Sequence, residues 1–173
     1  MKPMADLFEN IVTGWLTSKG YFVIQNLKDG RKEHDILAIE IRNGKAGNAR
    51  HIEVQCSSEP MGYLDGTAKK KNPKQIMQAV KKYVHKKYKD ASVQKQIEYF
   101  LGKNYTKMFV YGRLKDEPSQ VAALKANGID EVIKVSNIMD ELLNMKKKKN
   151  KGNFITAYTN RFQQMLKLYE ELS

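Results

Sequence analysis

HDILAIEI at His34–Ile41 and RHIEVQC at Arg50–Cys56 are the two stretches that decide the fold. The first stretch is a short, mostly apolar run, and in the second polar and apolar residues alternate. Both patterns predict β-strands. The intervening segment Asn43–Asn48 contains two glycines and predicts a loop or hairpin connection. Because the strands of a hairpin are antiparallel, the start of the first lies beside the end of the second. We therefore expect Asp35 to lie next to Glu53 and Gln55.

The alternation of side chains along the second stretch separates its polar residues from its apolar ones. His51, Glu53 and Gln55 share one face, and Ile52, Val54 and Cys56 share the other. We expect Cys56 to be a small buried apolar side chain, and His51 to direct its imidazole to the surface. The three histidines of the chain show no metal-ligand spacing, and His34 is a minor candidate for positioning a water molecule.

The remaining segments predict helices and strands that alternate along the chain. Strands are expected at 21–25, 105–111 and 131–135, and helices at 4–19, 73–89, 91–101, 119–126 and 137–145. Asn72-Pro73 provides an N-cap and first-turn pair for the second of these helices. The sequence thus predicts an α/β fold with a mixed sheet flanked by helices, in the order α-β-β-β-α-β-α-β-α.

The length of 173 residues fits one domain. We expect a single domain at residues 1–145, a lysine-rich linker at 146–153 and a C-terminal helix at 154–173. That helix carries apolar residues with which it could pack on the body of the protein or on a partner.

The positive charge of the chain is concentrated in two segments. Lys+Arg number 31 against 19 Asp+Glu, for a net charge of +12, and nine lysines without an acid lie between Lys69 and Lys89. Five more lie at Lys146–Lys151, so the rest of the chain is nearly neutral. Such focused charge is typical of nucleic-acid binding through phosphates. An anionic membrane surface is the weaker alternative, because the basic helix lacks Trp and Phe.

Several classes of protein are excluded by what the sequence lacks. No apolar run approaches the roughly 20 residues of a membrane-spanning helix, and no signal segment opens the chain. The single cysteine excludes an intramolecular disulfide and a cysteine-based zinc site. No phosphate-binding glycine loop and no Ser-His-Asp signature occur. We expect a cytoplasmic protein without a membrane partner.

The two carboxylates on the predicted hairpin indicate a metal site. Asp35 and Glu53 lie within apolar runs, where an ionised carboxylate needs a compensating cation. Mg²⁺ prefers oxygen ligands, so these carboxylates and the carbonyl of Val54 would form half of a cage. Glu9 lies at the edge of the apolar stripe of the first helix and could lean toward the same group. The alternative is a structural salt bridge between Glu53 and a lysine.

Glu9, Asp35 and Glu53-Val54-Gln55, in this order on a helix and two strands, resemble the motif of the PD-(D/E)XK, or restriction-endonuclease-like, nuclease superfamily. The resemblance implies a Mg²⁺-dependent DNA endonuclease, with Mn²⁺ as a substitute, of restriction, homing, junction-resolving or repair type. It implies that Asp35 and Glu53 hold the metal, that Glu9 is a direct or water-mediated ligand, and that Gln55 orients the attacking water.

Two residues depart from the family motif. His34 stands where the motif has proline, and Gln55 stands where it usually has lysine. In some relatives the following helix supplies this charge, which Lys70, Lys71, Lys74 or Lys81 could do here. The chain is then either an active variant or a non-catalytic DNA- or RNA-binding module with a degenerate nuclease fold.

The basic helix and the loop before it are the expected nucleic-acid interface. Lys70, Lys71, Lys74, Lys81 and Lys82 would hold the phosphate backbone, which positions a substrate without reading its sequence. Tyr63 could stack on a base or sugar, or belong to an ordinary connecting loop. Branched or palindromic DNA would call for a homodimer, with the helix at 154–172 as a candidate dimer element. RNA is the less favoured polymer.

Overall fold

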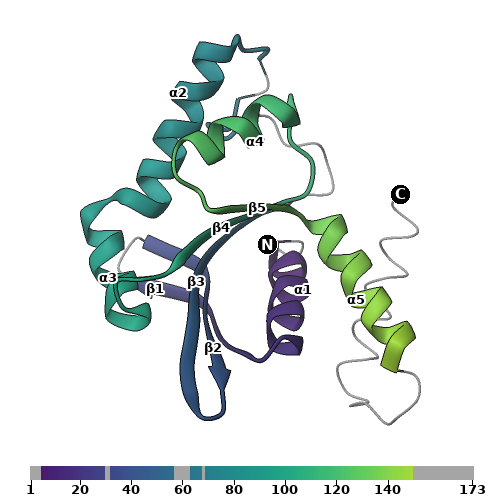
Figure 1. Cartoon of the computed structure of the whole chain (residues 1–173). Helices are drawn as coiled ribbons and strands as arrows, with labels where there is room; N and C mark the ends of the chain where they lie inside the picture. The colour runs from purple at the N-terminus through teal and green to yellow at the C-terminus, as the bar shows by residue number, and fades with distance from the viewer. Residues whose placement is uncertain (1–4, 30–31, 57–62, 68, 150–173) are drawn as a thin grey trace.

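The computed structural model describes residues 5–29, 32–56, 63–67 and 69–149 of the chain (Figure 1). Its centre is a five-stranded sheet in which the spatial order of the strands equals their order in the sequence. The first three strands are antiparallel, and the last two join as parallel strands. The strands are β1 (Tyr21–Asp29), β2 (Lys32–Arg42), β3 (Lys45–Gln55), β4 (Thr106–Tyr111) and β5 (Glu131–Lys134).

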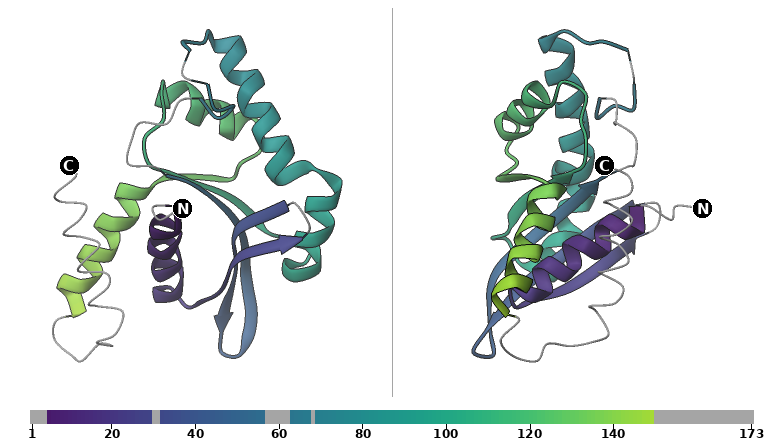
Figure 2. Two further views of the ribbon diagram at one scale, coloured as in Figure 1. Left: turned by 180° about the vertical axis from the view of Figure 1, so that it is seen from behind. Right: turned by 90° about the vertical axis from the view of Figure 1, so that its right-hand side faces the viewer.

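Helices cover both faces of this sheet (Figure 2). They are α1 (Ala5–Ser18), α2 (Pro73–Val84), η1 (His85–Lys89), α3 (Ala91–Leu101), α4 (Glu117–Ala126) and α5 (Val135–Lys149). On one face α1 and α5 enclose a core that includes Ile36, Ile52 and Met108. On the other face α2, η1, α3 and α4 pack on residues such as Leu37 and Phe109. The predicted mixed sheet with flanking helices is confirmed.

The connection between β2 and β3 is tighter than expected. Instead of a loop over Asn43–Asn48, β3 already begins at Lys45, and Asn43 and Gly44 form a two-residue turn. Both residues have a positive φ, of 51° and 73°, which a hairpin turn of this handedness requires. Asn and Gly are the residues that adopt such angles with least strain. The turn closes the hairpin that carries Asp35 and Glu53, and a β-bulge between Ile39 and Ile41 then sets the register at Ile36 and Ile52.

The start of α2 confirms the predicted cap. Asn72 Oδ1 accepts a hydrogen bond from the backbone N of Gln75 at 3.0 Å, and Gln75 Oε1 accepts one from the backbone N of Asn72 at 3.0 Å. This reciprocal pair satisfies two backbone donors that a helix start leaves without a partner. Pro73 occupies the first turn, where its missing N–H costs nothing.

The end of the described chain differs from the expected domain layout. α5 continues to Lys149, so residues 146–149 of the predicted linker are helical. The remainder of that linker and the predicted helix at 154–173 lie outside the described residues. Within residues 5–149, as far as they are described, every helix is too short or too polar to span a lipid bilayer.

Candidate active site

The strands β2 and β3 separate at one end of their hairpin, and this opening creates the site. Their backbone pairing ends at Ile36 and Ile52. Beyond that point a side chain replaces the backbone acceptor: Asp35 Oδ2 accepts a hydrogen bond from the backbone N of Val54 at 2.8 Å. The N–H and C=O of one strand residue point to the same side, so the Val54 carbonyl also faces β2. The predicted proximity of Asp35 to Glu53 is confirmed.

An irregularity in β1 lies opposite this opening. Asn26 has a φ of 52°, and it is skipped in the register that pairs Gln25 with Ile36 and Leu27 with His34. In a regular strand successive side chains point to opposite faces. Here two consecutive residues, His34 and Asp35, both contact the group around Glu53. His34 and Asp35, neighbours on β2, thus bring an imidazole and a carboxylate to the same group around Glu53.

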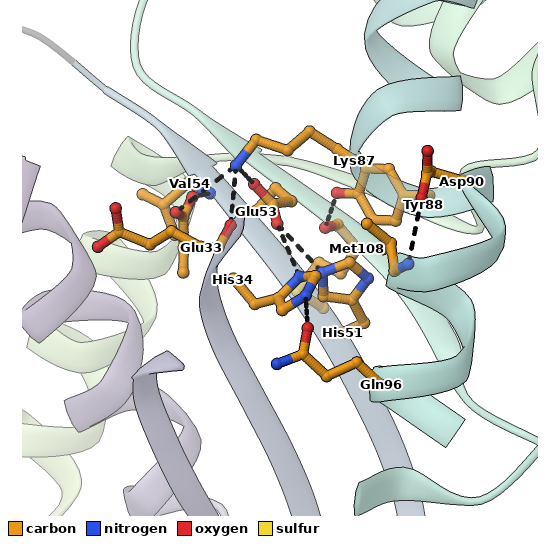
Figure 3. A network of polar contacts seen from close by, with 12 residues as sticks. Glu33, His34, His51, Glu53, Val54, Lys87, Tyr88, Asp90, Gln96 and Met108 are labelled. Atoms are coloured by element: carbon orange, nitrogen blue, oxygen red, sulfur yellow. Dashed lines mark hydrogen bonds and ion pairs between the residues drawn. The ribbon is translucent and has the colours of Figure 1, made fainter. Parts of the chain in front are cut away.

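The cation that faces the two carboxylates is Lys87, from the π-helix η1 (Figure 3). Its Nζ forms an ion pair with Oε2 of Glu53 and lies 4.0 Å from Oδ1 of Asp35. It also donates to the backbone carbonyl of Glu33 at 3.4 Å. None of the lysines named from the sequence for this role makes these contacts. Lys87 is the functional residue that sequence reasoning missed.

The π-helix holds Lys87 in place through its neighbour Tyr88. The Tyr88 side chain is fully buried, and its hydroxyl donates a hydrogen bond to the backbone carbonyl of Met108 in β4 at 2.6 Å. The turn closes when the backbone N of Asp90 donates to the carbonyl of His85 at 2.8 Å. Asp90 then caps α3 by accepting from the backbone N of Ser92 at 3.0 Å. The wide turn is therefore anchored on both sides of Lys87.

A sequence signal for Lys87 exists in the helical spacing of the basic segment. Ile76, Val80 and Val84 form the buried stripe of α2. Lys87 continues this stripe three residues after Val84, whereas Lys81, Lys82 and Lys86 lie on the exposed side. A lysine on the buried side of an amphipathic helix needs an anionic partner.

Asp35, Glu53 and Lys87 shift one another's pKa values. Burial raises the pKa of Asp35 to about 6, and the neighbouring charge of Glu53 adds to this while Lys87 opposes it. Burial likewise raises the pKa of Glu53, which is 0% exposed, against the opposing effect of Lys87. Burial alone would lower the pKa of Lys87, but the two carboxylates outweigh it and raise it. Two carboxylates thus face one ammonium, which leaves a net demand for positive charge.

Two buried histidines lie beside Glu53, and the burial of His51 is contrary to expectation. His51 was expected at the surface but is 0% exposed, and His34 is 2% exposed. His51 Nε2 donates to Glu53 Oε1 at 3.1 Å, and His34 Nε2 donates to Gln96 Oε1 of α3 at 2.9 Å. Burial lowers the pKa of both rings, that of His51 to about 3. The prediction failed because α3 covers this part of the sheet face, and the sequence gives no sign of which strand it covers.

Gln55 lies at the margin of the site, and Glu9 lies on α1 across the sheet from η1. Glu9 is buried on α1, which covers the opposite face of the sheet from η1. The adjacent Asn10 accepts a hydrogen bond from Gln25 at 3.3 Å, so this turn of α1 lies at the level of Ile36. Gln55 is partly buried at the end of β3, on the face of Glu53, and its side chain lies beside the Tyr83 hydroxyl.

The expected nucleic-acid residues divide into exposed and engaged ones. Tyr63 is 2% exposed and its hydroxyl accepts from the backbone N of Lys71 at 3.2 Å, so its ring cannot stack on a base in this structure. That expectation is corrected: the apolar cluster beneath the loop takes up the ring. Lys71 pairs with Asp65 at 2.8 Å. The exposed lysines are Lys70, Lys74, Lys81 and Lys82, the last two of which line a shallow depression with Gln78 and His85.

Comparisons with known proteins give one remote structural likeness. No family model matches the chain, and no curated protein matches it. A repair endonuclease from Pyrococcus abyssi is similar in structure, with 14% sequence identity and a TM-score of 0.37. The similarity covers 75% of this chain and 43% of the other, so the chain spans less than half of that protein.

Proposed function

We propose that this chain is a metal-dependent DNA endonuclease in which Lys87 supplies the charge that the usual motif places at Gln55. The observation that carries the proposal is the position of the Lys87 ammonium, paired with Glu53 and 4.0 Å from Asp35 at the open end of β2 and β3. A carboxylate pair with one adjoining ammonium is the arrangement that holds a metal and stabilises charge on a phosphate.

The donors at this opening fit Mg²⁺. Asp35, Glu53 and the Val54 carbonyl offer only oxygen atoms, which Mg²⁺ and Mn²⁺ prefer. Burial and, after it, the charge of Glu53 raise the pKa of Asp35, and a divalent cation would offset both effects. The Asp35 side chain keeps 14% of its surface exposed, which leaves it accessible from solvent. Mg²⁺ bound there would acidify a water molecule and neutralise the scissile phosphate.

The side chains of the chain itself have separate tasks in this proposal. Asp35 and Glu53 fix the position of the cation, and Lys87 donates to a phosphate oxygen as negative charge develops on it. Gln55 is proposed to orient the attacking water, and Glu9 to act as a further direct or water-mediated ligand. The exposed lysines of α2, among them Lys81 and Lys82, are proposed to hold the DNA backbone.

The type of endonuclease remains within the four classes that the resemblance implies. For palindromic or branched DNA we propose a homodimer, because cleavage of two strands requires two sites. The segment proposed for this contact, 154–172, lies outside the described residues. We also propose a cytoplasmic location.

A cleavage assay with matched lysine variants tests the proposal. Supercoiled plasmid, single-stranded DNA and a four-way junction are incubated with the protein in Mg²⁺, Mn²⁺ or EDTA. We expect metal-dependent cleavage that falls about 100-fold or more in Lys87→Met and in Asp35→Asn, which is the typical cost of losing a charge-stabilising group. DNA affinity should change by less than about threefold, because neither residue belongs to the proposed backbone-binding surface.

The control is Lys86→Met, which removes the neighbouring exposed lysine. It should cleave at nearly the rate of the parent protein. DNA that is bound but never cut by the parent, or equal losses in Lys86→Met and Lys87→Met, would instead support the non-catalytic DNA- or RNA-binding module.

A further inference from the structure

A second cluster of possible metal ligands lies on the inner side of Glu53. His34, His51 and Glu53 each present one ligand atom, and these three atoms lie within 4.8 Å of one another. All three side chains are at most 2% exposed. The cluster differs from the oxygen-only group described above, because two of its three donors are imidazole nitrogens.

The hydrogen bonds of His34 determine which of its nitrogens is available. The Gln96 amide oxygen can only accept, so His34 Nε2 carries the proton and Nδ1 carries a lone pair. Nδ1 is buried without a hydrogen-bond partner in the described structure and lies 3.9 Å from Glu53 Oε1. Two acceptors that face each other at this distance favour a cation between them.

Two of the three distances in the cluster are close to those of a zinc site. Glu53 Oε1 lies 3.1 Å from His51 Nε2 and 3.9 Å from His34 Nδ1. Ligands at about 2.1 Å from a tetrahedral zinc ion are about 3.4 Å apart, which lies between these two values. The hydrogen bond from Gln96 to the far side of His34 is the type of contact that orients a metal-binding imidazole.

We propose that His34 Nδ1, His51 Nε2 and Glu53 Oε1 form a binding site for a divalent transition-metal ion of the zinc class. Two imidazoles and one carboxylate are the donor set of such ions, and they leave a fourth position open. When the ion binds, the proton on His51 Nε2 moves to Nδ1. The imidazole changes tautomer and stays neutral. Glu53 is shared, since its Oε2 pairs with Lys87. The inference goes beyond the proposed nuclease function and does not depend on it.

The test measures metal binding by the full chain after removal of all metal. Co²⁺ is titrated and followed by its visible absorption, and the X-ray absorption spectrum of the Zn²⁺ form shows whether imidazoles are bound. We expect one equivalent to bind with an imidazole signature. His34→Gln should abolish this binding, while Asp35→Asn and His85→Gln retain it. His85 is the one histidine of the chain outside the cluster.

A second variant leaves all three ligands in place. Gln96→Leu removes the hydrogen bond that sets the His34 tautomer and should weaken binding about 10- to 100-fold, whereas Gln94→Leu on the same helix should not. Circular dichroism of each variant without metal establishes that it is folded. The proposal fails if the parent binds no Co²⁺, if Zn²⁺ binds without imidazole ligands, or if His34→Gln and Gln96→Leu bind like the parent. Loss of cleavage in Asp35→Asn with metal binding intact separates this site from the proposed nuclease centre.

Discussion

The positive charge beside Glu53 comes from Lys87 of η1, and not from position 55 on the strand that carries Glu53. In the family motif the lysine follows the glutamate by two residues on the same strand, and here that position holds Gln55. The Glu53 carboxylate, 0% exposed, instead receives its ammonium from η1. An ionised carboxylate at that depth requires such a partner whichever element supplies it. The absence of a lysine at position 55 therefore does not by itself exclude a charged site.

Tyr111 makes the stability of the fold depend on pH, and it does so independently of the candidate active site. Its hydroxyl donates a hydrogen bond to Glu117 at 3.0 Å, and burial together with this carboxylate raises its pKa to about 12. The unfolded chain loses this proton near pH 10, whereas the folded chain keeps it. The contribution of Tyr111 to stability is thus complete below pH 10 and is lost as the pH rises toward 12.

The comparison of the parent with Tyr111→Phe measures this effect. At pH 8 the variant should be less stable by about 1 kcal/mol, because it lacks the hydrogen bond. The difference should shrink between pH 10 and 12 in urea titrations. A difference that stays constant or grows over that interval would contradict the raised pKa.

At the scale of elements, the π-helix η1 contributes to the stability of the fold and also positions Lys87. Tyr88→Phe removes the hydroxyl that binds the Met108 carbonyl and should lower the free energy of unfolding by about 1 kcal/mol. Since η1 then loses a tether to β4, the cleavage rate should fall while DNA affinity is kept. Tyr99→Phe is the control, because Tyr99 is 83% exposed on the adjacent helix. Unchanged cleavage in Tyr88→Phe would show that Lys87 is held by its ion pairs alone.

The elements themselves were largely predictable because their signals are local. The Asn72 cap and the strand alternation at Arg50–Cys56 depend on residues a few positions apart. The meeting of Asp35 with Glu53 followed from hairpin geometry and required no tertiary information. The burial of His34 and His51 depends on where α3 packs. Helical spacing places Lys87 on the buried side of its helix, but its pairing with Glu53 depends on where η1 packs on the sheet.

At the scale of the whole molecule, the exposed lysines of α2 predict how DNA affinity responds to salt. Each lysine that contacts a phosphate contributes about 0.9 to the slope of log affinity against log salt concentration. Lys81→Gln with Lys82→Gln should therefore reduce that slope by about 2, measured by fluorescence anisotropy on a labelled duplex. The paired control is Lys45→Gln with Lys103→Gln, two exposed lysines at the hairpin end and after α3. Equal slopes in both double variants would place the DNA elsewhere.

The open end of β2 and β3 also has a consequence for the order of assembly. The Asp35–Val54 hydrogen bond spans 19 residues, whereas the contact of Lys87 with Glu33 spans 54. The cost of closing a loop grows with its length, and parallel pairing with β4 requires the longer closure. The acidic pair therefore comes together more readily than its cation can join it. Until then the two negative charges repel each other, and the arrival of Lys87 offsets one of them.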